Sequence, residues 1–104
     1  MRFPREVQRE MGFALYRAQL GRKHENAKPL KGFGGAGVLE VVEDFRGDTY
    51  RAVYTVRFPH VVYAIHAFQR KAARARKTSS RDIDRIRKRL REAEEHHASW
   101  LQDR

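Results

Sequence analysis

The feature that most constrains this fold is a pair of alternating runs of β-branched and aromatic residues, Thr49 to Phe58 and Val61 to Phe68. Pro59 lies between the runs, at the second position of the four-residue segment that joins them, where its fixed φ favours a tight turn. Two such runs with a turn between them are typical of an antiparallel β-hairpin. The hairpin is therefore the first element that we predict.

A two-residue turn would fix the register of this hairpin, with Arg51 opposite Phe68 and Val53 opposite His66. Because side chains alternate between the two faces of a strand, one face then collects mostly cationic and polar groups: Arg51, Thr55, Arg57, His66, Phe68 and Arg70. The other face is apolar, and we expect helices to cover it: Tyr50, Ala52, Tyr54, Val56, Tyr63, Ile65 and Ala67. The sequence predicts a sheet with a cationic side and a core side.

The segment before the hairpin predicts one helix and one further strand. Apolar residues recur at helical spacing from about Pro4 to Leu20, and Gly21 is a natural C-terminal stop. Residues 22–37 are polar and then glycine-rich, so we expect no regular element there. Alternation returns from Val38 to Phe45 and predicts a strand that turns directly into the hairpin.

The segment after the hairpin predicts a long amphipathic helix. Residues 72–77 form a basic connector, and Ser79 with Asp82 three residues later forms a helix start. We expect the helix to fray after about His97. The fold class is then α+β, a single domain over residues 1–104, with an N-terminal helix, a three-stranded antiparallel sheet and a long C-terminal helix.

The charge of the chain is large and unevenly distributed. Lys and Arg number 23 against 13 acids, and residues 66–91 alone hold 11 bases and 2 acids. A concentrated positive field attracts a polyanion, which favours nucleic acid over an anionic membrane surface. The final helix adds non-specific attraction to RNA or DNA.

The composition also argues against several other classes of protein. There is no cysteine, so the chain has neither disulfides nor a thiolate zinc site. His96 and His97 are adjacent and point about 100° apart on a helix, so they do not share a metal. We expect no cofactor and no metal, and the absence of a long apolar run predicts a cytoplasmic protein that does not enter the membrane.

The chain resembles the RelE/ParE toxin superfamily, in particular its phage-derived, HigB-like branch. The resemblance covers most of the chain and depends on two signatures together, Tyr50-Arg51-x-x-Tyr54 and His66-Ala67-Phe68-Gln69-Arg70-Lys71. It implies the toxin of a type II toxin–antitoxin pair, acting on mRNA at the ribosome, with a cognate antitoxin of the helix-turn-helix type in a hetero-oligomer. Members of the superfamily normally begin with a strand before the first helix, and that strand is absent at the start of this sequence.

The resemblance also implies site residues. Arg51 matches the arginine that contacts the scissile phosphate in ribonuclease members, and Arg70 and Lys71 match the basic pair at the end of the last strand. His66 belongs to the signature of the branch. Where RelE-type toxins carry lysines on the first central strand, this chain has Glu40 and Glu43.

Chemistry assigns roles to these residues. Metal-independent cleavage needs the 2′-hydroxyl deprotonated, the phosphorane charge neutralised and the leaving oxygen protonated. Arginine supplies the neutralisation but never acts as a base, so we predict His66 as general acid or base and Lys71 as the competing proton donor. RNA contacts are predicted on the same basic surface and beyond it: Phe68 as a stacking ring, with Arg57, Arg74, Lys77 and Arg81.

Three alternatives remain open at this point. The polar face of the hairpin can instead be an ordinary solvated face, with ion pairs from its arginines to Glu40 or Asp44. The chain can be a ParE-like inhibitor of DNA gyrase, which does not cut RNA. It can also be an inactive phage-derived protein that keeps the fold and binds a partner.

Overall fold

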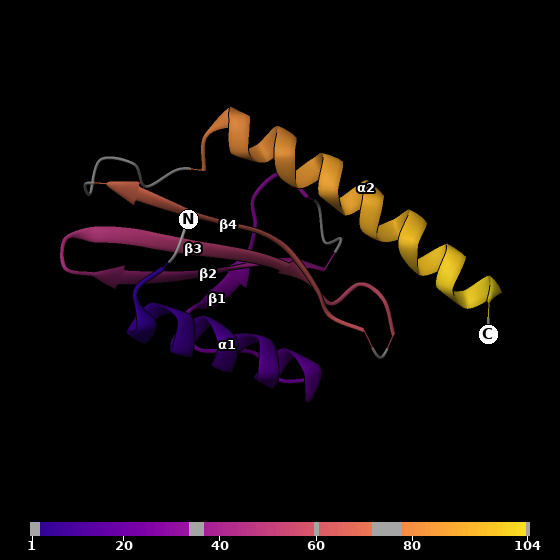
Figure 1. The fold of residues 1–104 in the computed structure, drawn as a ribbon, viewed down its shortest axis with the longest axis horizontal. Coiled ribbons are helices and arrows are strands. Elements are labelled where there is room, and N and C mark those ends of the chain that lie inside the picture. The colour runs from indigo at the N-terminus through magenta and orange to yellow at the C-terminus, as the bar shows by residue number, and fades with distance from the viewer. Residues whose placement is uncertain (1–2, 34–36, 60, 72–77, 104) are drawn as a thin grey trace.

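The computed structural model describes residues 3–33, 37–59, 61–71 and 78–103 (Figure 1), with Arg70 and Lys71 described by their backbone alone. Two helices enclose an antiparallel sheet whose four strands lie in the order β1-β2-β3-β4. The elements in chain order are α1 (Arg5–Gln19), β1 (Ala27–Pro29), β2 (Val38–Phe45), β3 (Asp48–Thr55), β4 (Tyr63–Lys71) and α2 (Ser80–Gln102). The predicted α+β class is confirmed, while the prediction of three strands is wrong.

Helix α1 lies within one residue of its predicted bounds at each end. Pro4 precedes the helix as its N-cap. At the other end Gly21 adopts a φ of 77°, its N–H bonds to the carbonyl of Ala18, and Arg22 N–H bonds to the carbonyl of Arg17. These two bonds form a Schellman motif, which explains why the helix stops at the predicted glycine.

Strands β2 and β3 form a hairpin with a two-residue turn. Phe45 pairs with Asp48, and the intervening Arg46 and Gly47 have φ values of 51° and 86°. Positive φ at both central residues is the requirement of a type I′ turn, whose twist matches that of the flanking strands. The bounds predicted for β2 are confirmed.

Strand β1 is the element that the sequence did not predict. Its three residues pair with β2 from Ala27 opposite Val41 to Pro29 opposite Leu39. A strand this short has too few residues to show alternation, and a proline is tolerated because β1 is an edge strand. The pairing with β2, not the local sequence, makes this segment a strand.

The predicted register of the second hairpin is confirmed along most of its length. Arg51 pairs with Phe68 and Val53 pairs with His66. The ladder ends at Thr55, three residues before the predicted end of the strand. The turn at Pro59 is present nonetheless, because Val61 N–H lies 3.3 Å from the Phe58 carbonyl oxygen.

A β-bulge shifts the register beyond Val53, so that Tyr54 pairs with Ala64 and Ile65 is the extra residue. Tyr63 is therefore opposite Thr55. Because one extra residue reverses the alternation, Tyr63 and Ile65 join the face that carries Arg51. Their predicted placement on the opposite face is wrong for that reason.

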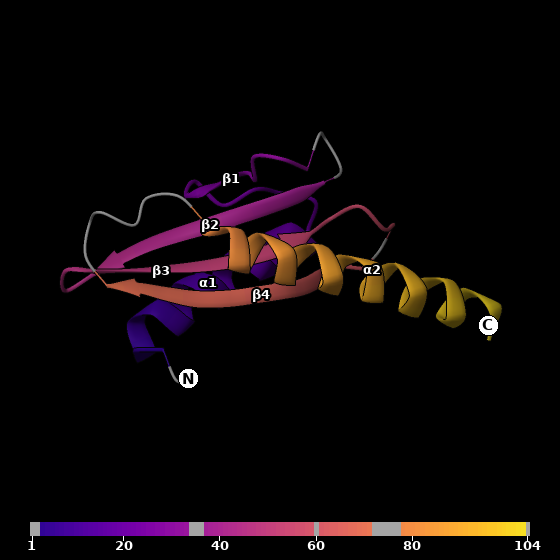
Figure 2. The same cartoon turned by 90° about the horizontal axis from the view of Figure 1, so that it is seen from above.

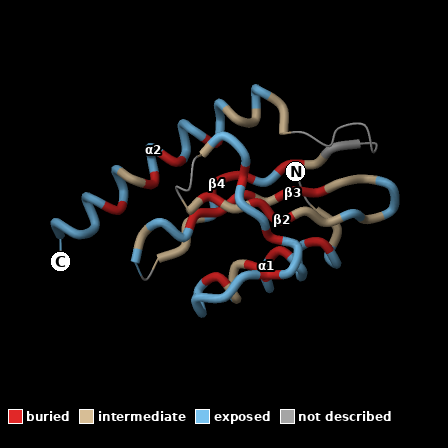
Figure 3. The backbone as a smooth tube through the Cα atoms, turned by 180° about the vertical axis from the view of Figure 1, so that it is seen from behind, coloured by how far each residue is buried: buried red, intermediate tan, exposed pale blue. Residues whose placement is uncertain are grey.

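Each face of the sheet is covered by one helix (Figure 2). On one side α1 contributes Ala14 and Ala18 to a cluster with Tyr54. On the other side α2 contributes Ile86 and Leu90 to a cluster with Val53. The tube in Figure 3 shows buried segments on both helices and on the strands between them. The predicted open cationic side of the sheet is therefore wrong, because α2 covers it.

Helix α2 begins as predicted but ends later. The Ser79 side chain caps it by accepting a hydrogen bond from Asp82 N–H at 3.2 Å. The helix does not fray at His97, whose buried ring packs 4.6 Å from that of Phe58, and it extends past the end of the sheet to Gln102 (Figure 1). The predicted connector at 72–77 lies outside the described residues.

Candidate functional site

Arg51 lies beneath α2 in a buried ion pair. Its Nη1 is 2.9 Å from Oε1 of Glu40 on the neighbouring strand, and the two residues are 6% and 3% exposed. Thr78, just before α2, donates to the other Glu40 oxygen at 3.0 Å. The ion pair between Arg51 and Glu40 that was predicted for a solvated polar face is thus present, but it is buried and not solvated. Asp44 instead accepts a hydrogen bond from Thr49.

His66 lies on the same face as Arg51 and both of its ring nitrogens are occupied. Nε2 is 3.0 Å from Oδ1 of Asp82, and Nδ1 is 2.8 Å from Nη1 of Arg89. Arginine only donates, so Nδ1 must accept, and the ring proton of a neutral imidazole is then on Nε2 and donated to Asp82. The carboxylate thereby fixes both the tautomer and the orientation of His66.

Phe68 is packed inside the protein and does not form an open platform. Its ring stacks on that of His66 at 5.2 Å and 25°, and the residue is 6% exposed in the cluster beneath α2. A base would reach this ring only after α2 had moved. The stacking role of Phe68 stays a prediction.

The other predicted site residues are spread over the surface. Arg57 is exposed and forms an ion pair with Glu94 of α2, and Arg81 is exposed in the first turn of α2. Arg70 and Lys71 end β4, where their backbone pairs with Thr49 and Asp48. The remaining two, Arg74 and Lys77, lie outside the described residues. The structure therefore brings together Arg51, His66 and Phe68, and it places Arg57 and Arg81 elsewhere.

A pocket of 530 Å³ opens between β1 and the start of α2, above the Arg51–Glu40 pair. Lys28 and Lys31 line it from β1 and the loop that follows, and Thr78 and Ile83 line it from the side of α2. Lys28 belongs to the strand that was not predicted, and Lys31 belongs to the loop after it. A sequence signal for Lys28 would have been the Ala-Lys-Pro segment interpreted as an edge strand, and no local pattern marks Lys31.

The structure adds two partners of His66 that the sequence did not identify, Asp82 and Arg89. The sequence assigns Asp82 only to the helix cap, which it also forms. The two residues are seven apart, two turns along α2, so both project from one side of the helix toward the sheet. Helical spacing would have revealed them only if α2 had been expected over this face.

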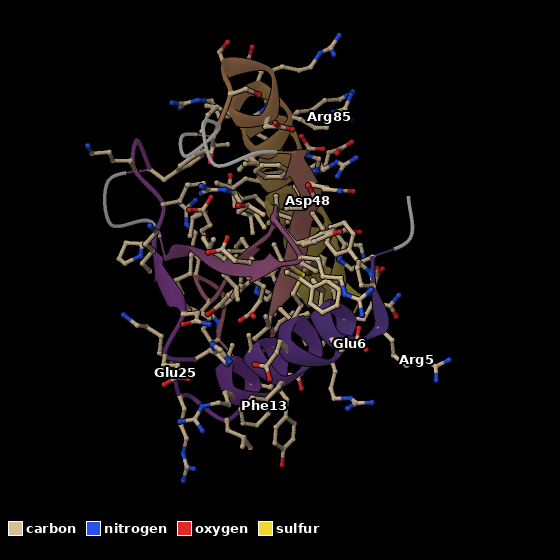
Figure 4. All side chains as sticks on the ribbon, turned by 90° about the vertical axis from the view of Figure 1, so that its left-hand side faces the viewer. Arg5, Glu6, Phe13, Glu25, Asp48 and Arg85 are labelled. Atoms are coloured by element: carbon tan, nitrogen blue, oxygen red, sulfur yellow. The ribbon has the colours of Figure 1, made fainter. Side chains whose placement is uncertain are left out.

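The charges of α2 are segregated along its length. Residues 80–91 contain six Lys or Arg and two Asp, whereas residues 92–102 contain three Glu and no Lys or Arg. The helix dipole favours the reverse arrangement, with acids in the first turns and bases in the last. All six bases are exposed, and Arg85 extends from α2 at the upper right of Figure 4: Arg81, Arg85, Arg87, Lys88, Arg89 and Arg91.

A group of possible metal ligands lies on the α1 side of the sheet. Glu10, His24 and Glu43 place one ligand atom each within 4.8 Å of one another. However, His24 Nδ1 accepts the backbone N–H of Asn26 at 3.0 Å, so the ring proton is on Nε2, which faces Glu10 at 3.1 Å. A protonated nitrogen does not ligate a metal, and the arrangement fits a hydrogen-bonded clamp on the loop after α1.

No described helix has the length and apolar character needed to cross a membrane. In comparisons with known proteins, residues 1–91 match the family model described as "Phage derived protein Gp49-like (DUF891)". The match includes the pocket, Arg51, His66 and the basic half of α2, and it ends where the acidic half begins. No curated protein and no solved structure matches the chain.

Proposed function

Because the chain belongs to the Gp49-like family of phage-derived proteins, we propose that it is the toxin of a type II toxin–antitoxin pair that cuts mRNA on the ribosome. The family is related to RelE/ParE-type toxins and suggests an antitoxin partner. We also propose that the chain belongs to the HigB-like branch of that superfamily and that its activity is the cutting of RNA.

The observation that carries the proposal is the placement of Arg51 and His66. Arg51 is opposite Phe68 and His66 is two residues before Phe68 in the same strand, so the two are diagonal neighbours on one face, roughly 7 to 8 Å apart. Each is oriented by a carboxylate, Glu40 for Arg51 and Asp82 for His66. A guanidinium beside an oriented imidazole suits phosphodiester cleavage.

The exposed bases on the first half of α2 support a polynucleotide substrate. These bases lie near the N-terminal end of α2, where the helix dipole is already positive, so they destabilise the free protein. A bound polyanion would offset this unfavourable interaction. The proposed path of the RNA runs along this half of α2 to the pocket at its start.

The proposed reaction is attack of the ribose 2′-oxygen on the adjacent phosphorus. It requires the first half of α2 to move away from the sheet, because His66 is only 9% exposed beneath that helix. The new bond forms as the bond from phosphorus to the 5′-oxygen breaks, leaving a 2′,3′-cyclic phosphate and a 5′-hydroxyl. Arg89 is exposed and can exchange its bond to His66 Nδ1 for one to the RNA phosphate. Nδ1 then takes the 2′-proton, Arg51 neutralises the phosphorane, and Lys71 protonates the 5′-oxygen.

The test is cleavage of mRNA by purified protein in a translating ribosome extract, mapped by primer extension. Arg51→Lys keeps a charge opposite the buried Glu40 but loses the planar fork of the guanidinium, so we expect a folded protein that cuts about 10²- to 10³-fold more slowly. Arg22→Lys, at an exposed position after α1, is the matched control and should cut normally.

Undiminished cleavage by Arg51→Lys would remove Arg51 from the site. Protein that leaves mRNA intact but blocks supercoiling by purified gyrase would replace the proposal with the ParE-like activity. A folded protein without effect in either assay would favour the inactive binding protein.

A further inference from the structure

We infer that the pocket between β1 and the start of α2 binds one phosphate of the polynucleotide, adjacent to the scissile one, through Lys28 and Lys31. This inference rests on the proposed function, because it takes RNA as the ligand. It assigns a binding role to two residues in a segment that the sequence did not identify as structured.

Lys28 lines the pocket from strand β1. Lys28 is directly opposite Glu40, which places it on the same face of the sheet as Arg51. β1 and β3 are two strand spacings apart, and Arg51 is two residues along β3 from the position opposite Glu40, so Lys28 begins roughly 12 Å from Arg51. A cation at that distance is suited to a neighbouring phosphate and not to the scissile phosphate itself.

Lys31 adds a second cation from the loop after β1. Both lysines are exposed and line the pocket, and neither makes an ion pair with a residue that the structure describes. Lysine side chains of this kind are hydrated point charges with three donors, which bind phosphate without a fixed geometry.

Helix α2 brings a third cation to the same loop. The Arg87 guanidinium lies 5.0 Å from the centroid of the Phe33 ring, in a cation–π contact. Its Nη2 is 3.9 Å from where a Cβ on Gly32 would be. The loop that carries Lys31 is thus held against the basic half of α2, and the two basic segments form one surface.

The acid in the pocket does not neutralise these cations. Glu40 already pairs with Arg51 and accepts a hydrogen bond from Thr78, so its two oxygens are engaged. The charges of Lys28 and Lys31 are then available to a ligand. The site is concave and holds 530 Å³, within the range of small-ligand pockets, which favours a phosphate group over a flat protein surface.

The experiment measures binding of a short single-stranded 2′-O-methyl RNA, which lacks the attacking hydroxyl and cannot be cut. Fluorescence anisotropy would be recorded from low to high salt. The variant is the double change Lys28→Gln with Lys31→Gln. The control is Arg22→Gln with Lys23→Gln, which removes the same charge from exposed positions after α1. Thermal unfolding of each variant would show that it remains folded.

Two lost phosphate contacts should weaken binding by about 25-fold at 0.1 M salt and make the salt slope shallower by about 1.4. The control should change affinity by less than about threefold, through the long-range field alone. An affinity and slope like those of the control would overturn the inference.

The outcomes separate the pocket from the proposed function. If the wild type cuts mRNA but the lysine variant binds RNA normally, the pocket inference fails and the endonuclease stands. If the lysine variant weakens as expected and the wild type never cuts, the pocket is supported and the endonuclease fails. A variant that keeps its RNA affinity but no longer binds the antitoxin would show a protein-docking site and overturn the inference.

Discussion

The two faces of the sheet are both covered by a helix, yet they are built differently. On the α1 face the core contacts are mainly apolar, with small residues such as Ala14 and Ala18 packed against Tyr54. On the α2 face apolar contacts surround two polar pairs, the buried ion pair of Arg51 with Glu40 and the pair of buried His66 with the partly buried Asp82. The α1 face also holds one polar pair, His24 with the half-exposed carboxylate of Glu10, whereas the two polar pairs of the α2 face lie between the sheet and the helix.

This difference bears on the site that we propose on the α2 face. Removing two charges from water costs several kcal/mol per ion, and their mutual attraction recovers this only with good geometry. Replacement of a buried ion pair by well-packed apolar residues is often neutral or stabilising. The buried Arg51–Glu40 ion pair is thus weak evidence for a purely stabilising role, which is compatible with its proposed role in cleavage.

The largest expected effect is on the α2 face, from Glu40→Ala. The change leaves the Arg51 guanidinium buried without its carboxylate, and the free energy of unfolding should fall by about 3 to 5 kcal/mol. Urea unfolding followed by circular dichroism measures it. The exposed pair provides the control, since Glu94→Ala removes the partner of Arg57 at the surface and should cost less than about 1 kcal/mol. Equal losses for the two would mean that burial does not distinguish the pairs.

The cap of α2 should have an intermediate effect. Ser79→Ala removes the acceptor for Asp82 N–H and the hydroxyl that donates to the Asp82 carboxylate at 2.8 Å. We expect a loss of about 1 kcal/mol. Because Asp82 also orients His66, mRNA cleavage should fall with the cap. In contrast, α1 has no side-chain cap, so the same measurement on Pro4→Ala should leave cleavage unchanged. Normal cleavage by Ser79→Ala would separate the cap from the site.

The smallest expected effect is on the α1 face, from Tyr54→Phe. The Tyr54 hydroxyl is buried and has no hydrogen-bond partner among the described residues, so its removal should be neutral or stabilising by up to about 1 kcal/mol. Tyr63→Phe on the α2 face is the matched control, because its hydroxyl lies 2.9 Å from His96 Nδ1. It should cost about 0.5 to 1.5 kcal/mol. A greater loss for Tyr54→Phe than for Tyr63→Phe would contradict this comparison.

The stability of Tyr54→Phe should depend less on pH than the stability of the wild type does. Burial raises the pKa of Tyr54 above its ordinary value of 10.0. Above about pH 10 the unfolded chain loses this proton while the folded protein retains it, so stability falls as the pH rises. Tyr54→Phe removes this contribution, and the variant should lose less stability than the wild type between about pH 9 and pH 11. Parallel unfolding curves for the two proteins over that range would contradict it.

Much of the fold could be predicted because its signals are local. Alternation gave the bounds of β2, glycine geometry gave the end of α1, and Ser79 gave the start of α2. The register of the second hairpin also follows from alternation, up to the bulge at Ile65. Beyond that point one inserted residue reversed the faces, and no local pattern marks where a bulge occurs.

The site could be predicted only in part. Arg51 and His66 share a face as the register requires, but the partners that hold them, Glu40, Asp82 and Arg89, come from other elements. Lys28 lies in β1, which exists only because β2 offers an edge to pair with. Contacts between distant segments depend on how a helix packs on a sheet, and the conformational propensities of single residues do not predict that packing.

The sequence by itself determined where the two helices and the three longer strands lie, to within a few residues at their ends. It also determined which side chains alternate together up to the bulge, and that the excess positive charge is concentrated toward one region of the chain. Those properties follow from the steric preferences of single residues and from the period of each element. Only the tertiary structure decided that α2 covers the charged face and so buries Arg51 and His66 with carboxylates beside them. The burial of a charge depends on what packs over it, and that packing is a property of the whole chain.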